Sequence, residues 1–134
     1  MRRKKGMILA DIPKEITYRI KVHMNHKQLD VWRESMNLAE MIFSIKNISG
    51  YFSYQFQKSA ISIPSNIAEG SARDSAREQI RFYRVSLGSL TELETQYLLL
   101  VRFDENYKNY EFENQIEKVK ELILGTIRYL RNKL

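Results

Sequence analysis

Residues 110–134 read YEFENQIEKVKELILGTIRYLRNKL, and their apolar side chains recur every three or four positions. The residues that share this apolar face are Phe112, Ile116, Val119, Ile123, Ile127, Leu130 and Leu134. This period is typical of an amphipathic α-helix with one buried face. Glutamates in the first turn and basic residues in the last turn suit the helix dipole. The stretch therefore predicts a helix over residues 109–133.

Three upstream stretches repeat the same period. We expect helices over residues 28–46, 51–70 and 75–103. Their expected core residues are Trp32, Met36, Ala39 and Phe43; Phe52, Phe56, Ala60, Ile63 and Ile67; and Tyr83, Leu87, Leu90, Tyr97 and Val101. Leu38, Ile42 and Ile45 widen the first of these stripes, and Phe82, Val85, Leu93 and Leu100 lie beside the third. Short connections between amphipathic helices favour antiparallel packing. The predicted fold class is therefore all-α, an up-down-up-down four-helix bundle preceded by an N-terminal extension.

Proline, glycine and serine refine this prediction. Pro64 removes a backbone donor and crowds the carbonyl four residues before it, which predicts a kink or local unwinding in the second helix. Gly70 suits the left-handed position that ends a helix. Ser75–Glu78 has the pattern of a capping box for the third helix. Gly88 costs up to about 1 kcal/mol relative to alanine, so we expect a neighbouring helix to approach it closely.

The composition bounds the class of protein. A chain of 134 residues with 43% hydrophobic residues has the size and apolar content of one globular domain. The absence of cysteine excludes disulfides, thiol catalysis and cysteine metal sites. The apolar run after the basic N-terminus is too short for a secretory signal, and no stretch approaches the roughly 20 apolar residues of a membrane span. We expect a cytoplasmic protein without membrane contact.

The formal net charge of +6 belongs to a basic arm, residues 1–27, in which eight basic residues face two acidic ones. The four-helix region, residues 28–134, carries 14 residues of each sign. The arm opens with Arg2, Arg3, Lys4 and Lys5. Such an arm favours contact with an anionic partner such as nucleic acid, although basic runs are often only solvated.

Within the arm, residues 16–22 alternate between apolar and polar side chains, a period of two that predicts a strand. The apolar positions are Ile16, Tyr18, Ile20 and Val22. A single strand has no pairing partner inside a helical bundle. Three alternatives follow: it pairs between subunits, it is extended, or it is not native and translation starts at Met24.

Few residues suit catalysis. His23 and His26 lie in or beside the arm, so no Ser-His triad forms within the bundle unless the arm folds back. Their spacing would suit two metal ligands, but no carboxylate joins them, which favours two exposed histidines. Glu92 and Glu94 lie on different helix faces, and no phosphate-binding glycine loop is present. We expect no enzymatic activity, metal, cofactor or small-molecule substrate.

Two charged features lie on the predicted helices. Arg77, Arg81 and Arg84 form one stripe that a phosphate backbone could follow, or an ordinary solvated face offset by neighbouring acidic residues. Antiparallel packing brings Lys58 near Glu92, either as a partly buried ion pair or as two solvated charges.

Residues 62–73, SIPSNIAEGSAR, and 82–96, FYRVSLGSLTELETQ, closely resemble the signature of one family. That family comprises the four-helix-bundle proteins encoded by intervening sequences in bacterial 23S ribosomal RNA genes, with the pattern SIPxNIAEGxxR followed by F-x-x-x-x-x-GS-x-x-EL. Leu29–Trp32 is similar to the family's opening L-x-V-W. The signature positions here are Ser62, Pro64, Asn66, Glu69, Gly70, Arg73, Gly88, Ser89 and Glu92.

The resemblance, which spans residues 28–134, implies a left-handed four-helix bundle that assembles into a homopentamer. Nucleic-acid binding is the role usually suggested for the family, and no signature position brings a catalytic role with it. The chain departs from the family at Gln57 and Lys58, where two arginines are usual, and in the shortened loop 47–53. The first departure weakens the case for a basic cluster on the second helix.

Two functional hypotheses follow. The first is a non-enzymatic, oligomeric RNA-binding protein that uses the arm and the stripe of Arg77, Arg81 and Arg84. The second is a protein-interaction scaffold without direct nucleic-acid contact.

Overall fold

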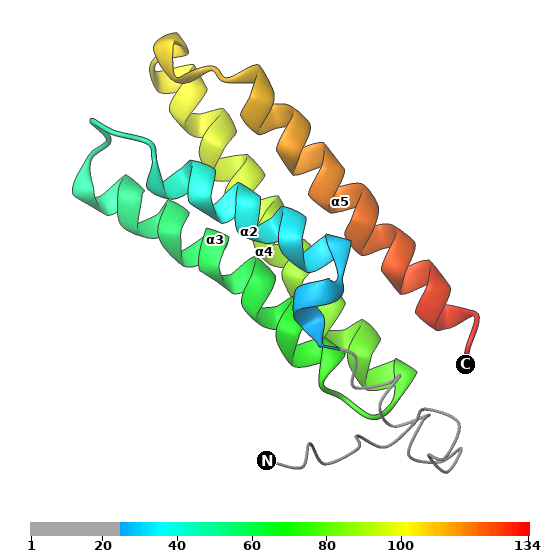
Figure 1. The fold of residues 1–134 in the computed structure, drawn as a ribbon. Helices are drawn as coiled ribbons and strands as arrows, with labels where there is room; N and C mark the ends of the chain where they lie inside the picture. The colour runs from blue at the N-terminus through cyan, green and yellow to red at the C-terminus, as the bar shows by residue number, and fades with distance from the viewer. Residues whose placement is uncertain (1–24) are drawn as a thin grey trace, which may run out of the picture.

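The computed structural model describes residues 25–134, which form four α-helices and no β-strand. The helices are α2 (Asp30–Phe43), α3 (Gly50–Ser71), α4 (Ala76–Phe103) and α5 (Tyr110–Arg131), with 3-10 turns η2 (His26–Gln28) and η3 (Glu105–Tyr107). Each helix packs on the next, and α5 packs back on α2 (Figure 1). The predicted all-α, up-down-up-down bundle is confirmed. The predictions for Arg2, Arg3, Lys4, Lys5, His23 and the strand lie outside the described residues.

The core of the bundle combines the apolar faces expected for three helices. The predicted face of α5 is buried from Phe112 to Leu130, while Leu134 is exposed. The core residues of α3 and α4 that are buried include Phe56, Ala60, Ile63, Ile67, Tyr83, Leu90, Leu93, Tyr97 and Leu100. Phe52, Leu87 and Val101 pack against them as partly buried side chains. The helical period therefore identifies these faces correctly except at Val85, which was expected beside the core stripe of α4 and is exposed.

The predicted core face of α2 is confirmed at Leu38, Ala39 and Ile42, which are buried, and wrong at Met36 and Phe43. Met36 and Phe43 are exposed, and the buried row passes through Val31, Ser35 and Leu38 and continues to Ile42. Ser35 interrupts this row as a polar residue, which made its neighbours look like the better stripe. Its hydroxyl donates to the Trp32 carbonyl at 2.7 Å, so serine is buried without an unsatisfied group.

The first helix is also shorter than expected, with 14 residues against 22 in α3 and in α5. Residues 26–28 form a separate 3-10 turn, which the Asn25 side chain caps by accepting from the Lys27 amide at 3.1 Å. At the other end, α2 stops at Phe43 with Ser44 as its C-cap, before the left-handed residue Asn47, whose φ is 65°. The expected helix 28–46 is thus reduced at both ends.

The α-helix α3 continues through Pro64 without unwinding. Two side chains donate hydrogen bonds to the backbone carbonyls that directly follow the carbonyl crowded by Pro64. Ser65 Oγ donates to the Ile61 carbonyl at 2.7 Å, and Asn66 Nδ2 donates to the Ser62 carbonyl at 2.8 Å. Pro64 is buried, so packing against the neighbouring helices holds this segment in place.

Polar contacts attach α5 to both of its neighbours. Gln115 Nε2 donates to Glu34 Oε2 at 2.7 Å, and Lys118 Nζ lies 3.2 Å from Glu34 Oε1. On the other side, Lys120 Nζ bridges Glu94 at 3.3 Å and Glu117 at 3.1 Å. The hydrogen bond from Gln115, followed by that from Lys118, lowers the pKa of Glu34 below its usual value of 4.5.

We predict that Glu34→Gln removes a pH-dependent part of the stability. A carboxylate with a lowered pKa in the folded state stabilises the fold above about pH 4.5, and this contribution disappears as the pH falls through the folded-state pKa. At pH 7 the variant should lose about 1 kcal/mol of unfolding free energy. Urea unfolding at pH 7 and pH 3 measures the difference. Glu40→Gln, an exposed glutamate on the same helix, is the control, and an equal loss at both pH values would contradict the assignment.

Candidate nucleic-acid interface

The signature segment forms the contact between α3 and α4, the most extensive contact between any two helices of the bundle. Ser62 and Ser89 share a hydrogen bond of 2.7 Å across the interface. Asn66 Nδ2 donates to the Ser62 Oγ at 3.1 Å. Ser86, which is fully buried, donates to the Ile63 carbonyl at 2.8 Å. Small polar side chains therefore connect the two backbones directly, without long side chains between them.

The two signature glycines do not have the roles expected for them, a helix end at Gly70 and a close helix approach at Gly88. Gly70 lies inside α3 with an ordinary helical φ, and an added Cβ would be 3.0 Å from the Phe82 Cβ. An added Cβ at Gly88 would meet nothing within 4 Å. The sequence shows where a glycine lies along the chain, but not which of its sides faces a neighbouring helix. Gly70 allows the close approach that was expected at Gly88.

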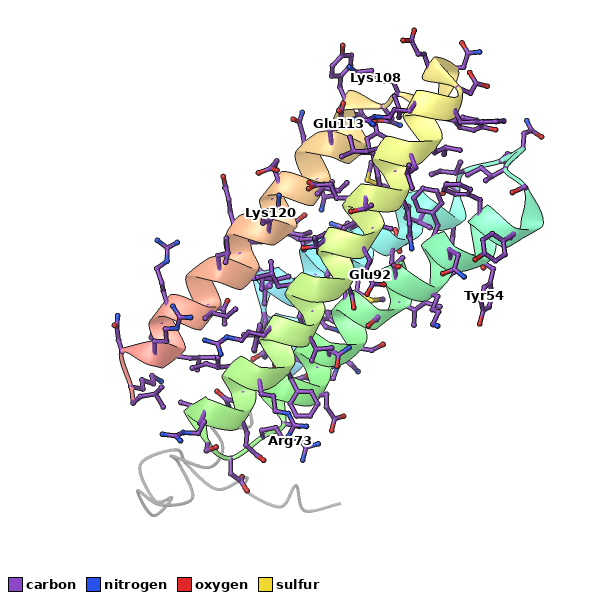
Figure 2. All side chains as sticks on the ribbon, turned by 180° about the vertical axis from the view of Figure 1, so that it is seen from behind. Tyr54, Arg73, Glu92, Lys108, Glu113 and Lys120 are labelled. Atoms are coloured by element: carbon purple, nitrogen blue, oxygen red, sulfur yellow. The ribbon has the colours of Figure 1, made fainter. Side chains whose placement is uncertain are left out.

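Arg73 belongs to the turn that joins α3 to α4, at one end of the bundle (Figure 2). Its guanidinium forms an ion pair with Glu69 and lies 4.7 Å from the centroid of the Phe82 ring. Gln79 Nε2 donates to its carbonyl at 2.9 Å. These contacts fix the geometry of the turn, so Arg73 and Glu69 are already engaged within the chain.

Arg77, Arg81 and Arg84 are exposed along the first half of α4. None of the three forms an ion pair with another residue of the described range. Only Arg81 has a ring contact, with its guanidinium 5.9 Å from the Phe82 centroid. Ser75 caps this end of α4 by accepting from the Glu78 amide at 3.2 Å, as the capping pattern predicted. The structure therefore leaves the arginine stripe available to solvent.

The predicted contact between Lys58 and Glu92 is absent. Both residues are exposed, and they form no ion pair with each other. Figure 2 shows Glu92 on α4 on the outer side of the bundle. The alternative, two solvated charges, is correct.

An apolar surface on α3 and α4 was not anticipated from the sequence. Its exposed members are Tyr51, Tyr54, Ile61, Val85, Leu99 and Phe103, which we call the α3–α4 apolar face. Tyr54 projects outward from α3 in Figure 2. The spacing of Tyr51, Tyr54 and Ile61 by three and seven residues is itself a helical stripe, on the side of α3 away from its core residues.

The remaining histidine within the described range has a packing role. His26 lies edge-on to Trp32, with ring centroids 5.1 Å apart. In residues 25–134, no three histidine, aspartate or glutamate side chains converge as metal ligands would. None of the helices in that range combines the length and apolar character needed to cross a membrane.

The family model described as 23S rRNA-intervening sequence protein matches residues 27–126. The chain belongs to this family. The match covers α2, α3 and α4 completely and most of α5, whereas residues 1–26 lie outside it. As a 23S rRNA-intervening sequence protein, the chain carries its signature residues mainly in the α3–α4 contact. No curated protein matches the sequence.

We predict that Gly70→Ala and Gly88→Ala have opposite effects on stability. The added methyl at Gly70 meets Phe82, and forcing the two helices apart should cost about 1–3 kcal/mol. The methyl at Gly88 meets nothing and should stabilise α4 by up to about 1 kcal/mol. Thermal unfolding followed by circular dichroism measures both. If the two variants shift the melting temperature in the same direction, the assigned roles of the glycines are wrong.

Proposed function

We propose that this member of the 23S rRNA-intervening sequence protein family is a non-enzymatic RNA-binding protein that acts in the cytoplasm as a homo-oligomer. The observation that carries the proposal is the stripe of Arg77, Arg81 and Arg84, which is exposed and free of ion pairs with residues 25–134. From Arg77 to Arg84 the stripe runs roughly 10 Å along α4. Arginine suits phosphate because its planar guanidinium donates two parallel hydrogen bonds.

The energetics of the stripe support an anionic partner. An arginine that is already paired must give up its carboxylate before it binds phosphate, which cancels part of the gain. Arg77, Arg81 and Arg84 have no carboxylate partner among residues 25–134 to give up, in contrast to Arg73, which is paired with Glu69. Binding of phosphate then releases counterions, so affinity falls steeply with salt. The basic arm, which carries the net charge of the chain, would add to this attraction.

The α3–α4 apolar face supports self-association, and the family resemblance implies a homopentamer. Six exposed large apolar side chains on two adjacent helices form a candidate interaction surface. Several copies would present several arginine stripes to one RNA, so weak individual contacts would act together. The same apolar face is also the observation that favours the second candidate function, a scaffold that binds another protein.

We predict that replacing Arg77, Arg81 and Arg84 together with glutamine weakens RNA binding at least tenfold at low salt. The slope of log affinity against log salt should fall by roughly 2 per chain, because each lost phosphate contact removes about 0.7–0.9. Fluorescence anisotropy with a structured RNA measures both quantities.

The matched control for this triple variant replaces Lys46, Arg102 and Lys108 with glutamine. These three exposed residues carry the same charge and lie at the opposite end of the bundle from Arg73, where Figure 2 shows Lys108. An equal loss in both triple variants, or binding that does not depend on salt, would contradict a site on the first half of α4. Deleting residues 1–23 then measures the contribution of the arm.

We predict that light scattering gives a mass near five times the 16.0 kDa of the chain. Tyr54→Glu places a charge on the α3–α4 apolar face and should lower this mass, because a buried unpaired carboxylate is costly. Asn114→Glu, an exposed position on α5, is the control. A monomeric wild-type protein would contradict the assembly.

The scaffold alternative predicts a different result in a pull-down from cell lysate. A protein partner remains bound after nuclease treatment, whereas partners held through RNA are released. Retention of one stoichiometric protein after nuclease, together with no RNA binding at low salt, would favour the scaffold.

A further inference from the structure

Among residues 25–134, the bundle lacks one wall at the end where α2 begins. Glu34 of α2 contacts Gln115 and Lys118 of α5, so Asp30, one turn earlier in an antiparallel helix, is level with about residue 121. From there α5 continues for ten residues to Arg131, or roughly 15 Å. Figure 1 shows the last turns of α5 and the α3–α4 turn extending past the start of α2.

A groove of about 1240 Å³ occupies this end of the bundle. Its apolar lining includes Ala76 and Tyr83 from α4 and Leu122, Tyr129 and Leu130 from α5. Gly125 lies in the same lining, and an added Cβ there would meet nothing within 4 Å. The groove is thus the space that an additional segment on the α2 side would cover.

The chain itself leads into this groove. Leu29, the residue immediately before α2, is part of the lining. The 3-10 turn His26–Gln28 lies directly before it, so the described chain begins, at Asn25, four residues before a residue that lines the groove. Among them, residues 16–22 carry an apolar side chain at every second position. An extended segment with this pattern has one apolar face to bury and one polar face to expose.

We propose that the segment Ile16–Val22 of the same chain binds in this groove and completes the wall that α2 leaves open. Its apolar side chains then cover Leu122 and Tyr129, and Arg19 and Lys21 face solvent. Because Arg77 also lines the groove, the bound segment brings arm charges beside the arginine stripe. The binding itself does not depend on RNA, so its test is independent of the proposed function.

The absence of cysteine from the chain allows a direct test by disulfide scanning. Gly125→Cys is combined in turn with a cysteine at each position from 16 to 23, in the full-length protein. Disulfides form only when the two Cα atoms come within about 7 Å. We expect intramolecular disulfides at one or more of Ile16, Tyr18, Ile20 and Val22 to form at least tenfold faster than at the positions between them.

Gly88→Cys provides the matched control for this scan. Gly88 also lies within a helix with open space at its Cβ, but on α4 outside the groove. Equal rates for the Gly88 and Gly125 series, or a flat profile along positions 16–23, would overturn the proposal. Disulfides that form only between chains would overturn it as well, because the groove would then be filled by a second copy.

A second measurement keeps the test independent of the cysteine variants. Gly125→Trp fills the groove, whereas Gly88→Trp adds the same side chain elsewhere. In the wild-type protein, trypsin should cut after Arg19 and Lys21 at least fivefold more slowly than after Lys4 and Lys5. Gly125→Trp should abolish this difference and Gly88→Trp should retain it, with helicity checked by circular dichroism. Equal cleavage of all arm sites in the wild-type protein would overturn the proposal.

Discussion

Gly70 and Phe82 lie so close that a single methyl group between them would be 3.0 Å from the Phe82 Cβ. This approach sets the separation of α3 and α4 at the end where they are joined. The hydrogen bonds from Ser86 to the Ile63 carbonyl and between Ser62 and Ser89 need the same short separation further along. A larger residue at Gly70 would therefore disturb the whole row of contacts. The stability of the α3–α4 pair depends on this geometry.

The same geometry divides the arginines into two groups. Arg73 is held by Glu69 and by the Phe82 ring, because α3 ends beside the first turns of α4. Arg77, Arg81 and Arg84 follow on the outer side of α4, where no carboxylate of the described range pairs with them. These four arginines lie within twelve positions of one another but have different roles despite their common side chain. The first stabilises the turn, and the others remain available for an external anion.

The helical period predicted most of the fold because the faces of α3, α4 and α5 are continuous rows of apolar residues. The prediction failed where a buried position is polar, as at Ser35, and at the end of α2, which stops at Phe43 although a break was expected only from Asn47. The arginine stripe could be predicted from spacing alone. The roles of Gly70 and Gly88 could not, because which side of a glycine faces a neighbour depends on how two helices pack. The absence of a contact between Lys58 and Glu92 could not be predicted either, because it also depends on how two helices pack.

The short length of α2 has a consequence for the order in which the bundle opens. Four residues connect α3 to α4, so their contact closes a small loop, whereas Glu34 and Gln115 are 81 positions apart. Contacts between distant positions cost more chain entropy to form. With five buried residues against eight in α3 and six in α5, α2 also has fewer core contacts to offset that cost. These features favour α2 as the first helix to detach and α3 with α4 as the last helix pair to separate.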